Sequence, residues 1–305
     1  MNAGAGERLE PSWSAQSLGT ALHLETKGDH FVIESEDYWS FAGRLFGGYA
    51  AALAFSAAAR RSGDRDPLSM WCRFLEPVRA GPVEIRAHVL ARGRSTTALR
   101  SEIIQDGAVA LTVNAWFGDR RPGEIEGWSG ESGGARPPEP NDCPEIFWRQ
   151  KKNAFDASFE RRAIDYPLDR SEFAQRPETI ELWLRPNPDE EFDELTNAAI
   201  DVMCFDLHMT ESAVERPWVS RARSFSYDLA VLWHERPTKG WRRMRYESRP
   251  HGGVAACRSW MWSVEGRHVA AAGQQARIGR LEQPSGVAES GVTGDANGRR
   301  GGNHE

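Results

Sequence analysis

Alternation of hydrophobic and polar residues predicts most of the secondary structure in this chain. In the segment PVEIRAHVLARG, at residues 82–93, Val83, Ile85 and Val89 fall on one face and charged residues fall on the other. The turn sequences QDG and VEG suit hairpins between such strands. The pattern therefore predicts two series of long antiparallel strands, near residues 67–76, 82–93, 96–105 and 108–118, and near residues 219–233, 240–249, 254–264 and 267–278.

One helix precedes each series of strands, and a shorter strand precedes each helix. The helices are predicted at 47–61 and 196–208, and the short strands at about 30–38 and 155–164. Residues 50–59 of the first helix read AAALAFSAAA, which is small and apolar on every side. Such a helix must be buried all round, so we expect a sheet to wrap around it. This arrangement is the hotdog fold, of the α+β class.

The chain also contains an internal repeat. The tetrapeptide ALRS at 98–101 corresponds to ACRS at 256–259, and Val109 corresponds to Val269, at an offset that stays between 158 and 160. Several matches in one order at one offset indicate a duplication. We therefore predict a double hotdog, in which two antiparallel sheets each wrap around one central helix.

Shifts in composition mark the expected boundaries between these units. The segment that joins the two halves is rich in Gly and Pro and lacks a strand pattern, and the last residues are polar with little to bury. The boundaries predicted in this way are a flexible N-terminus at 1–25, an N-terminal hotdog at 26–119, a linker at 120–145, a C-terminal hotdog at 146–280 and a disordered tail at 281–305.

Composition and charge exclude several classes of function. With 40% hydrophobic and 27% charged residues, the chain suits a globular protein with a sizeable core. Its net charge of −6 and scattered basic residues argue against a nucleic-acid partner. No apolar run approaches the roughly 18 residues that span a membrane, and the first residues lack a signal-peptide core. The four cysteines form no CxxC pair, so we expect a reduced, cytoplasmic protein without a metal or other cofactor.

Five segments carry a further signal through their order and spacing. They are FGGY (46–49), RFLEPVRAG (73–81), NAAIDVM (197–203), SYDLAVLWHERP (226–237) and VAAAGQQARI (269–278). Together they make the chain resemble the type II acyl-CoA thioesterase family from about residue 28 to residue 280. The resemblance implies hydrolysis of an acyl thioester, carried by CoA or by a carrier protein, without a covalent intermediate or a metal.

The resemblance also implies a catalytic set of an Asp in the second helix, a Thr or Ser in the next strand and a Gln in the last strand. These positions correspond to Asp201, Ser226 and Gln274. Gln275 is adjacent, and because side chains alternate across a strand only one of the two can face the site; we favour Gln274. In the first half the position equivalent to Gln274 is Asn114, and the first helix carries no carboxylate. One active site is therefore expected.

Each residue of this set has a chemical task. A carboxylate such as Asp201 can accept a proton from water, and it lies in an apolar stretch where an unused, unpaired charge would be costly. Ser226 and Gln274 each offer a donor and an acceptor with which to position that water. Backbone N–H groups of Gly47, Gly48 and Tyr49 at the start of the first helix could stabilise the oxyanion.

An alternative without hydrolysis stays open. The family usually places Gln after the double glycine, whereas this chain has Tyr49. A hotdog protein could instead bind or cyclise a hydrophobic, polyketide-like intermediate in its cavity. Five tryptophans could line an acyl pocket or could belong to the core, namely Trp71, Trp116, Trp233, Trp260 and Trp262.

Other candidates are weaker. Hydratases of this fold need an Asp and a His about five residues apart before the helix, and no such pair is present. His208 and His234 are possible bases, but nothing pairs them with a nucleophile, so we interpret them as structural. Because hotdog sheets commonly pair with one another, a homo-oligomer is expected.

Overall fold

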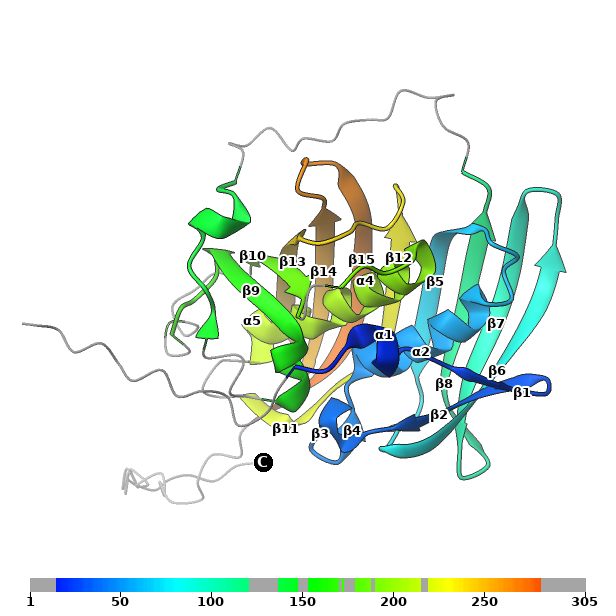
Figure 1. Ribbon diagram of the computed structural model, residues 1–305. Coiled ribbons are helices and arrows are strands. Elements are labelled where there is room, and N and C mark those ends of the chain that lie inside the picture. Colours follow the sequence, from blue (N-terminus) through cyan, green and yellow to red (C-terminus); the bar gives the residue numbers. More distant parts are fainter. Residues whose placement is uncertain are drawn as a thin grey trace, which may run out of the picture.

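A single curved antiparallel sheet forms the body of the protein and encloses two helices (Figure 1). The computed structural model describes residues 15–120, 137–147, 153–169, 172, 179–187, 190–214 and 219–280. Within these residues the main sheet has thirteen strands, and a small second sheet has two. The central helices α2 (Gly47–Ala59) and α4 (Glu194–His208) pack against each other inside the curve of the main sheet.

The two halves contribute matching sets of strands. In the N-terminal half the order is β1-β2-β6-β7-β8-β5, with bounds β1 (Glu25–Lys27), β2 (His30–Ser35), β5 (Asp66–Phe74), β6 (Gly81–Arg92), β7 (Thr96–Gln105) and β8 (Ala108–Gly118). In the C-terminal half the order is β12-β15-β14-β13-β10-β9, with bounds β9 (Phe159–Asp165), β10 (Thr179–Pro186), β12 (Asp228–Trp233), β13 (Arg242–His251), β14 (Val254–Trp262) and β15 (His268–Arg280). A further strand, β11 (Val219–Ser226), pairs with β15.

Strands β5 and β12 pair along the boundary between the halves. Trp71 lies opposite Ala230 at the middle of this seam, and the pairing extends from Asp228 to Leu232. The two predicted sheets are therefore joined edge to edge into one, so the strand that would end each sheet is covered by its counterpart. The predicted double hotdog is confirmed. The sequence pattern did not reveal that the two sheets are continuous through the β5–β12 pairing.

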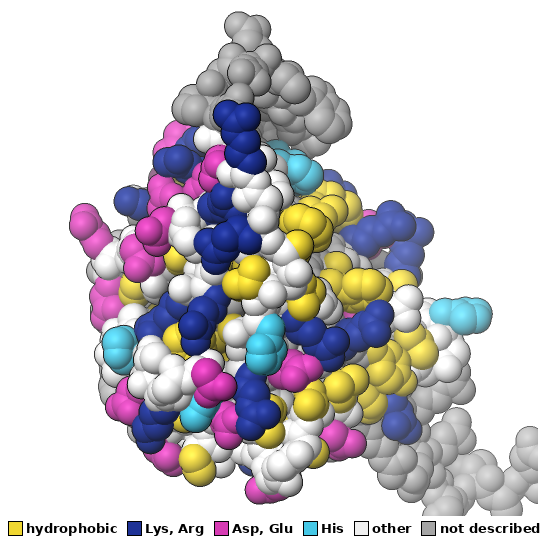
Figure 2. Space-filling view, turned by 90° about the vertical axis from the view of Figure 1, so that its right-hand side faces the viewer, with side chains coloured by type: hydrophobic (Ala, Val, Ile, Leu, Met, Phe, Trp, Pro, Cys, Tyr) yellow, Lys and Arg dark blue, Asp and Glu magenta, His cyan; other side chains and the backbone are white. Residues whose placement is uncertain are grey.

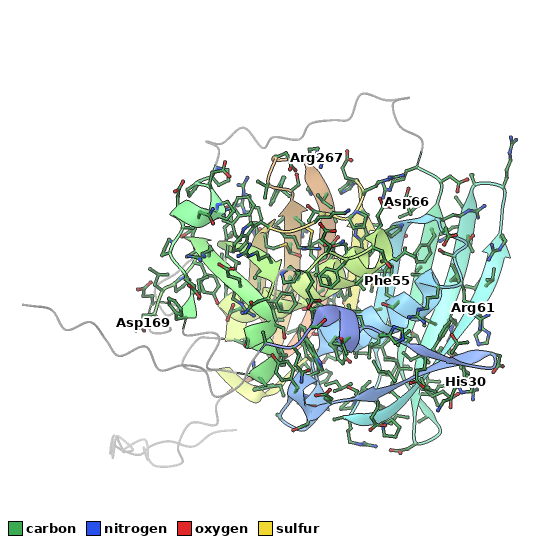
Figure 3. All side chains as sticks on the ribbon, in the orientation of Figure 1. His30, Phe55, Arg61, Asp66, Asp169 and Arg267 are labelled. Carbon is green, nitrogen blue, oxygen red and sulfur yellow. The ribbon has the colours of Figure 1, made fainter. Side chains whose placement is uncertain are left out.

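Both helices are buried on nearly every side, as the apolar pattern predicted. From Gly48 to Ala59, α2 has only one residue that is not buried, Ser56. Phe55 of α2 stacks on Phe117 and on Trp233, which come from the two halves of the sheet. In Figure 3 its ring lies in the interior, between the helices and the strands. α4 begins where the Asp193 side chain accepts a hydrogen bond from the Thr196 N–H, a standard helix N-cap.

Several short elements connect these parts. They are α1 (Leu18–Ala21), the 3-10 turns η1 (Asp37–Trp39), η2 (Pro140–Asp142) and η3 (Ala154–Ser158), the two-residue strands β3 (Ser40–Phe41) and β4 (Arg44–Leu45), and α5 (Glu211–Val214). α1 falls in the segment that was predicted to be flexible, yet Leu18, Leu22 and Leu24 are buried. They join the core beside α2, and their burial outweighs the polar character of the surrounding sequence.

The predicted linker and tail are only partly described. Residues 137–145 pack on the C-terminal half, where the Trp183 indole N–H donates to the Pro138 carbonyl. The tail predicted at 281–305 lies outside the described residues. Strand β10 was not predicted, because its sequence TIELWLRP lies in a polar, Pro-containing region without a neighbouring turn signal.

The outer surface mixes charged and hydrophobic side chains. The face shown in Figure 2 carries hydrophobic, basic and acidic groups interspersed with one another. Trp71 and Trp116 are about half exposed, at 47% and 49%. Side chains alternate along β5 and β8, and in both strands the residues on either side of the tryptophan point inward, so the tryptophan points outward. Among the described residues, no helix is long and apolar enough to cross a membrane.

Candidate active site

The carboxylate of Asp206, in the last turns of α4, is the centre of the candidate site. Its Oδ1 atom accepts a hydrogen bond from the Gln274 amide at 2.5 Å and one from the Ser226 hydroxyl at 3.3 Å. The backbone N–H of Gly48, at the start of α2, also hydrogen-bonds to this carboxylate. Three donors from three elements therefore converge on one half-buried acid.

The two glycines at the start of α2 allow this approach. A Cβ atom on Gly48 would lie 2.7 Å from Cζ of Phe46 and 2.9 Å from Cβ of Asp206. A Cβ atom on Gly47 would lie 3.0 Å from the Asp206 Oδ2 atom and 3.3 Å from the Phe74 ring. The space at Gly48 is thus too small for a Cβ atom unless a neighbour shifts, and the space at Gly47 is tight.

Of the two adjacent glutamines in β15, Gln274 points inward. Its side chain is 4% exposed, and its Oε1 atom has no hydrogen-bond partner in the described part of the chain. Gln275 is exposed and uses only its backbone, whose N–H donates to Asp228. The alternation along the strand therefore gives Gln274 an acceptor that remains available to a bound water or ligand.

A cavity of about 470 Å³ opens beside these residues. Asp206, Ser226 and Gly47 line it, whereas Gln274 and Gly48 contact Asp206 without being part of the lining. Most of the remaining wall is apolar, with five phenylalanines, Phe41, Phe46, Phe74, Phe155 and Phe225. A few polar groups in a mostly apolar cavity are typical of a site for a small organic ligand.

Burial makes Asp206 a stronger base than a carboxylate in water. Desolvation raises its pKa above the ordinary value, and the hydrogen bonds from Gln274, Gly48 and Ser226 act in the opposite direction. No Lys or Arg forms an ion pair with Asp206 in the described residues. The acid is therefore held by neutral donors, which leave it able to take up a proton.

The predicted meeting of Asp201 with Ser226 and Gln274 is wrong. Asp201 is fully buried and its Oδ1 atom accepts from the Arg242 guanidinium at 2.7 Å, with the Trp233 indole N–H at 3.4 Å from Oδ2. Burial raises the pKa of Asp201 to about 6 despite the neighbouring Arg242. This carboxylate is part of an internal ion pair and does not line the cavity.

Helix geometry explains the error. Asp201 and Asp206 are five residues apart, which places them about 140° apart around the helix axis and roughly 7.5 Å apart along it. Both lie in apolar surroundings in the sequence, so burial alone could not distinguish them. The position of each aspartate along α4 could have distinguished them. The predicted oxyanion donors lie at the start of α2, and the end of α4 packs against that start. Asp206 is the acid nearest that end of α4.

Tyr49 does not contribute its side chain to the cavity. Its ring is buried and stacks on Trp39 at 4.7 Å, and its hydroxyl donates to the Ala21 carbonyl at 2.9 Å. Of the three residues predicted for the oxyanion, Gly47 lines the cavity and Gly48 is bonded to Asp206. Tyr49 instead attaches α1 to the core.

His208 has no free nitrogen with which to act as a base. The Arg161 Nε–H lies 3.2 Å from its Nε2 atom, and its Nδ1 atom contacts a Glu211 carboxylate oxygen. Because a guanidinium can only donate, Nε2 must accept and Nδ1 must carry the proton. His234 is exposed, packs beside His268 and does not line the cavity.

The first half does not carry a second copy of the site. In the strand register Ala115 lies opposite Leu99, as Gln274 lies opposite the equivalent Cys257. The counterpart of Gln274 is therefore Ala115 and not Asn114, which is exposed. The alignment by sequence was one residue out because the β7–β8 hairpin and its counterpart differ in length.

The five tryptophans considered as pocket lining do not line this cavity. Trp71 and Trp116 are on the outer face, Trp233 and Trp262 are buried, and Trp260 is partly buried. The aromatic lining comes from phenylalanines, which the sequence did not single out. In the described residues, no group of three or more His, Cys, Asp and Glu side chains could hold a metal ion.

The duplicated halves, each with a sheet curved around a helix, define a double hotdog protein whose cavity lies between the start of one helix and the end of the other. A family model for the acyl-CoA thioesterase N-terminal domain matches residues 35–118, and one for the C-terminal domain matches residues 137–278. These matches cover more than half of the chain, which belongs to the acyl-CoA thioesterase family.

Solved structures share the fold at low sequence identity. The tesB protein of Mycobacterium avium subsp. paratuberculosis matches with a TM-score of 0.70 at 23% identity, over 86% of this chain and 99% of that one. A protein of unknown function with a hot dog fold from Alicyclobacillus acidocaldarius gives 0.73 at 21%, over 88% and 100%. The acyl-CoA thioesterase II TesB2 of Mycobacterium marinum gives 0.69 at 21%, over 89% and 100%. A search of curated proteins found no match.

Proposed function

We propose that the protein hydrolyses acyl-CoA thioesters and that Asp206, not Asp201, is the general base. The observation that carries this proposal is the convergence of Gln274, Ser226 and the Gly48 N–H on the Asp206 carboxylate, at the wall of a cavity. This arrangement can hold a water molecule next to a base. Family membership supports the thioester as the bond that is cleaved.

The reaction begins with a water molecule held by Asp206, the Gln274 amide oxygen and the Ser226 hydroxyl. Asp206 takes a proton from this water as its oxygen attacks the thioester carbonyl carbon. The carbonyl oxygen becomes an oxyanion, and the Gly47 N–H and the positive end of α2 stabilise it. The C–S bond then breaks, and the sulfur leaves with the proton that Asp206 had received. The products are a carboxylic acid and free CoA.

The proposal needs both helices in one site. α2 supplies backbone donors whose intrahelical acceptors do not exist, since the first N–H groups of a helix are unpaired within it. α4 supplies the carboxylate, and β15 and β11 supply Gln274 and Ser226. The site is thus assembled from both halves. In the first half, Ala115 stands at the position that corresponds to Gln274, so that half has no amide there to position a water molecule.

The test is the release of free thiol from a panel of acyl-CoAs by the wild type, by Asp206→Asn and by Asp201→Asn. A general base contributes about 10²–10⁴-fold, so Asp206→Asn is expected to lose activity on that scale while it remains folded. Folded Asp201→Asn is expected to retain activity per folded molecule. Folding is checked for each variant by near-UV circular dichroism.

Two results would contradict the proposal. If Asp206→Asn keeps full activity, this residue is not the base. If the wild type binds acyl-CoAs but releases no thiol from any of them, the protein uses its cavity to bind or cyclise a hydrophobic intermediate instead.

A further inference from the structure

A stack of four aromatic rings backs one wall of the cavity. Phe46 and Phe155 lie face to face, with ring centroids 4.8 Å apart and planes inclined by 10°. Phe155 continues onto Trp39 at 6.4 Å and 17°, and Trp39 continues onto Tyr49 at 4.7 Å and 19°. Phe46 and Phe155 line the cavity, whereas Trp39 and Tyr49 are behind them and 1% exposed.

The stack is fixed at both ends. Tyr49 is held by its hydrogen bond to the Ala21 carbonyl, and Tyr38 packs edge-on against Trp39 at 5.2 Å. At the other end the Phe46 ring fills the space that a side chain on residue 48 would need. Because the rings come from both halves of the chain and are close-packed, this wall cannot give way without disturbing the core.

Phe46 also precedes the glycine that lines the cavity beside Asp206. An acyl group whose carbonyl carbon is held between Asp206 and Gly47 can therefore lie against the Phe46 and Phe155 rings, which line the same cavity. The cavity of about 470 Å³ is in the lower half of the range of roughly 300–1,000 Å³ that is usual for ligand pockets. It must also hold the thioester and the water.

We propose that the Phe46–Phe155 wall sets an upper limit on acyl size, so that the protein selects compact acyl groups, short-chain or ring-bearing, over long straight chains. This inference rests on the proposed thioester substrate but concerns binding and not hydrolysis. The flat rings give a compact acyl group a broad contact surface, while a long chain meets a wall that is two aromatic layers thick.

The experiment measures the affinity of acyl-CoAs from acetyl to palmitoyl for Asp206→Asn by calorimetry, because slow hydrolysis in this variant limits the consumption of substrate during the titration. Affinity should rise about fourfold per added methylene while the chain is still being buried, and should stop rising at a medium length. In Asp206→Asn/Phe155→Ala this break is expected to shift to longer chains by at least two carbons. In Asp206→Asn/Phe55→Ala, which removes a buried ring of the same size away from the cavity, the break is expected to stay in place.

If Phe155→Ala fails to fold, Phe155→Leu takes its place, since it retains contact with Trp39 and is expected to give a smaller shift in the same direction. An affinity in the parent variant that keeps rising to palmitoyl-CoA would overturn the proposal. An unchanged break in a folded Phe155 variant would overturn it as well. Because all of these are binding measurements, they stand whether or not the wild type releases thiol.

Discussion

Two aspartates on one helix, Asp201 and the half-buried Asp206, show how the surroundings of a carboxylate decide its role. Asp201 is paired with a guanidinium that also donates to the Asn197 side chain and to the Thr238 and Gly240 carbonyls. Among the described side chains, Asp206 has only neutral donors, and it faces a cavity. The first arrangement neutralises the carboxylate inside the fold, and the second leaves it able to accept a proton.

The comparison also shows why burial is a poor guide to function by itself. Desolvation raises the pKa of both carboxylates. What differs is the access of a substrate to the carboxylate, which depends on the face of the helix that carries it. A perturbed carboxylate is a functional candidate only where a cavity reaches it.

The largest effect on stability is expected from Arg242→Met. This change removes the cation and leaves the Asp201 carboxylate buried without compensation, which costs about 3–5 kcal/mol. The free energy of unfolding from urea titration measures the loss. The double variant Asp201→Leu/Arg242→Met is the control: with both charges gone, stability should return to near the wild-type value, and a double variant as unstable as the single one would show that packing is the cause.

The pH dependence of Arg242→Met sharpens this prediction. The pKa of Asp201 in the folded protein is about 6 and rises further without Arg242, whereas the unfolded chain has an ordinary Asp pKa near 3.9. Between these values the folded state binds a proton that the unfolded state does not bind. The wild type gains the same proton below about pH 6, so the variant should regain stability relative to the wild type as the pH falls through its own, higher pKa towards 6, and the difference should stay constant below that. A difference that does not shrink as the pH falls towards 6 would contradict the ion-pair interpretation.

A smaller loss is expected where the two helices meet. Gly48→Ala introduces a Cβ atom within 3 Å of Phe46 and Asp206, and such overpacking costs about 1–3 kcal/mol. In an open helix the same change would stabilise, because Ala is a better helix former than Gly. The thermal unfolding temperature and the rate of thiol release should both fall in Gly48→Ala. In Gly47→Ala both are expected to fall less. A Gly48→Ala variant more stable than the wild type would mean that the contact is loose.

A change in the pH dependence of activity is expected from Gln274→Met. Gln274 is the strongest of the hydrogen-bond donors that hold down the pKa of Asp206, so Gln274→Met should raise this pKa further. Since the base must be ionised, the acid limb of kcat/KM should move to higher pH. Gln275→Met changes the adjacent, exposed residue and is expected to leave the limb in place. Equal shifts in the two variants would refute the assignment of Gln274.

The smallest effect is expected from Ser226→Ala. The Ser226 hydroxyl is 3.3 Å from the Asp206 oxygen, a longer contact than that of Gln274. A net hydrogen bond of about 0.5–1.5 kcal/mol corresponds to a two- to tenfold fall in kcat/KM, and Ser226→Thr, which keeps the hydroxyl, should restore part of it. A loss as large as that of Asp206→Asn would give Ser226 a role in proton transfer.

The sequence predicted the fold well because periodicity reports directly on burial. The alternation at 82–93 and the all-apolar run at 50–59 correspond closely to β6 and α2. The seam between β5 and β12 could not be predicted, since edge pairing leaves no mark on the alternation of either strand.

The site was predicted less completely. Ser226 and Gln274 do meet, but at a carboxylate about 1.4 helical turns from the expected one. Choosing between Asp201 and Asp206 required the relative rotation of α2 and α4, which is fixed by contacts between the halves. The phenylalanine lining was missed for the same reason, because Phe46 and Phe155 are over 100 residues apart and only the folded chain brings them together.

The repeat suggests two separable modules, but the candidate site needs both of them, and the seam between β5 and β12 holds them together. The glycine pair comes from one module and the acid from the other, so neither half could act alone. If the chain were cut between residues 120 and 137, the two fragments would still pair through five residues of β5 and five of β12. Mixing them should therefore rebuild the site by complementation, with each fragment silent until its counterpart is added.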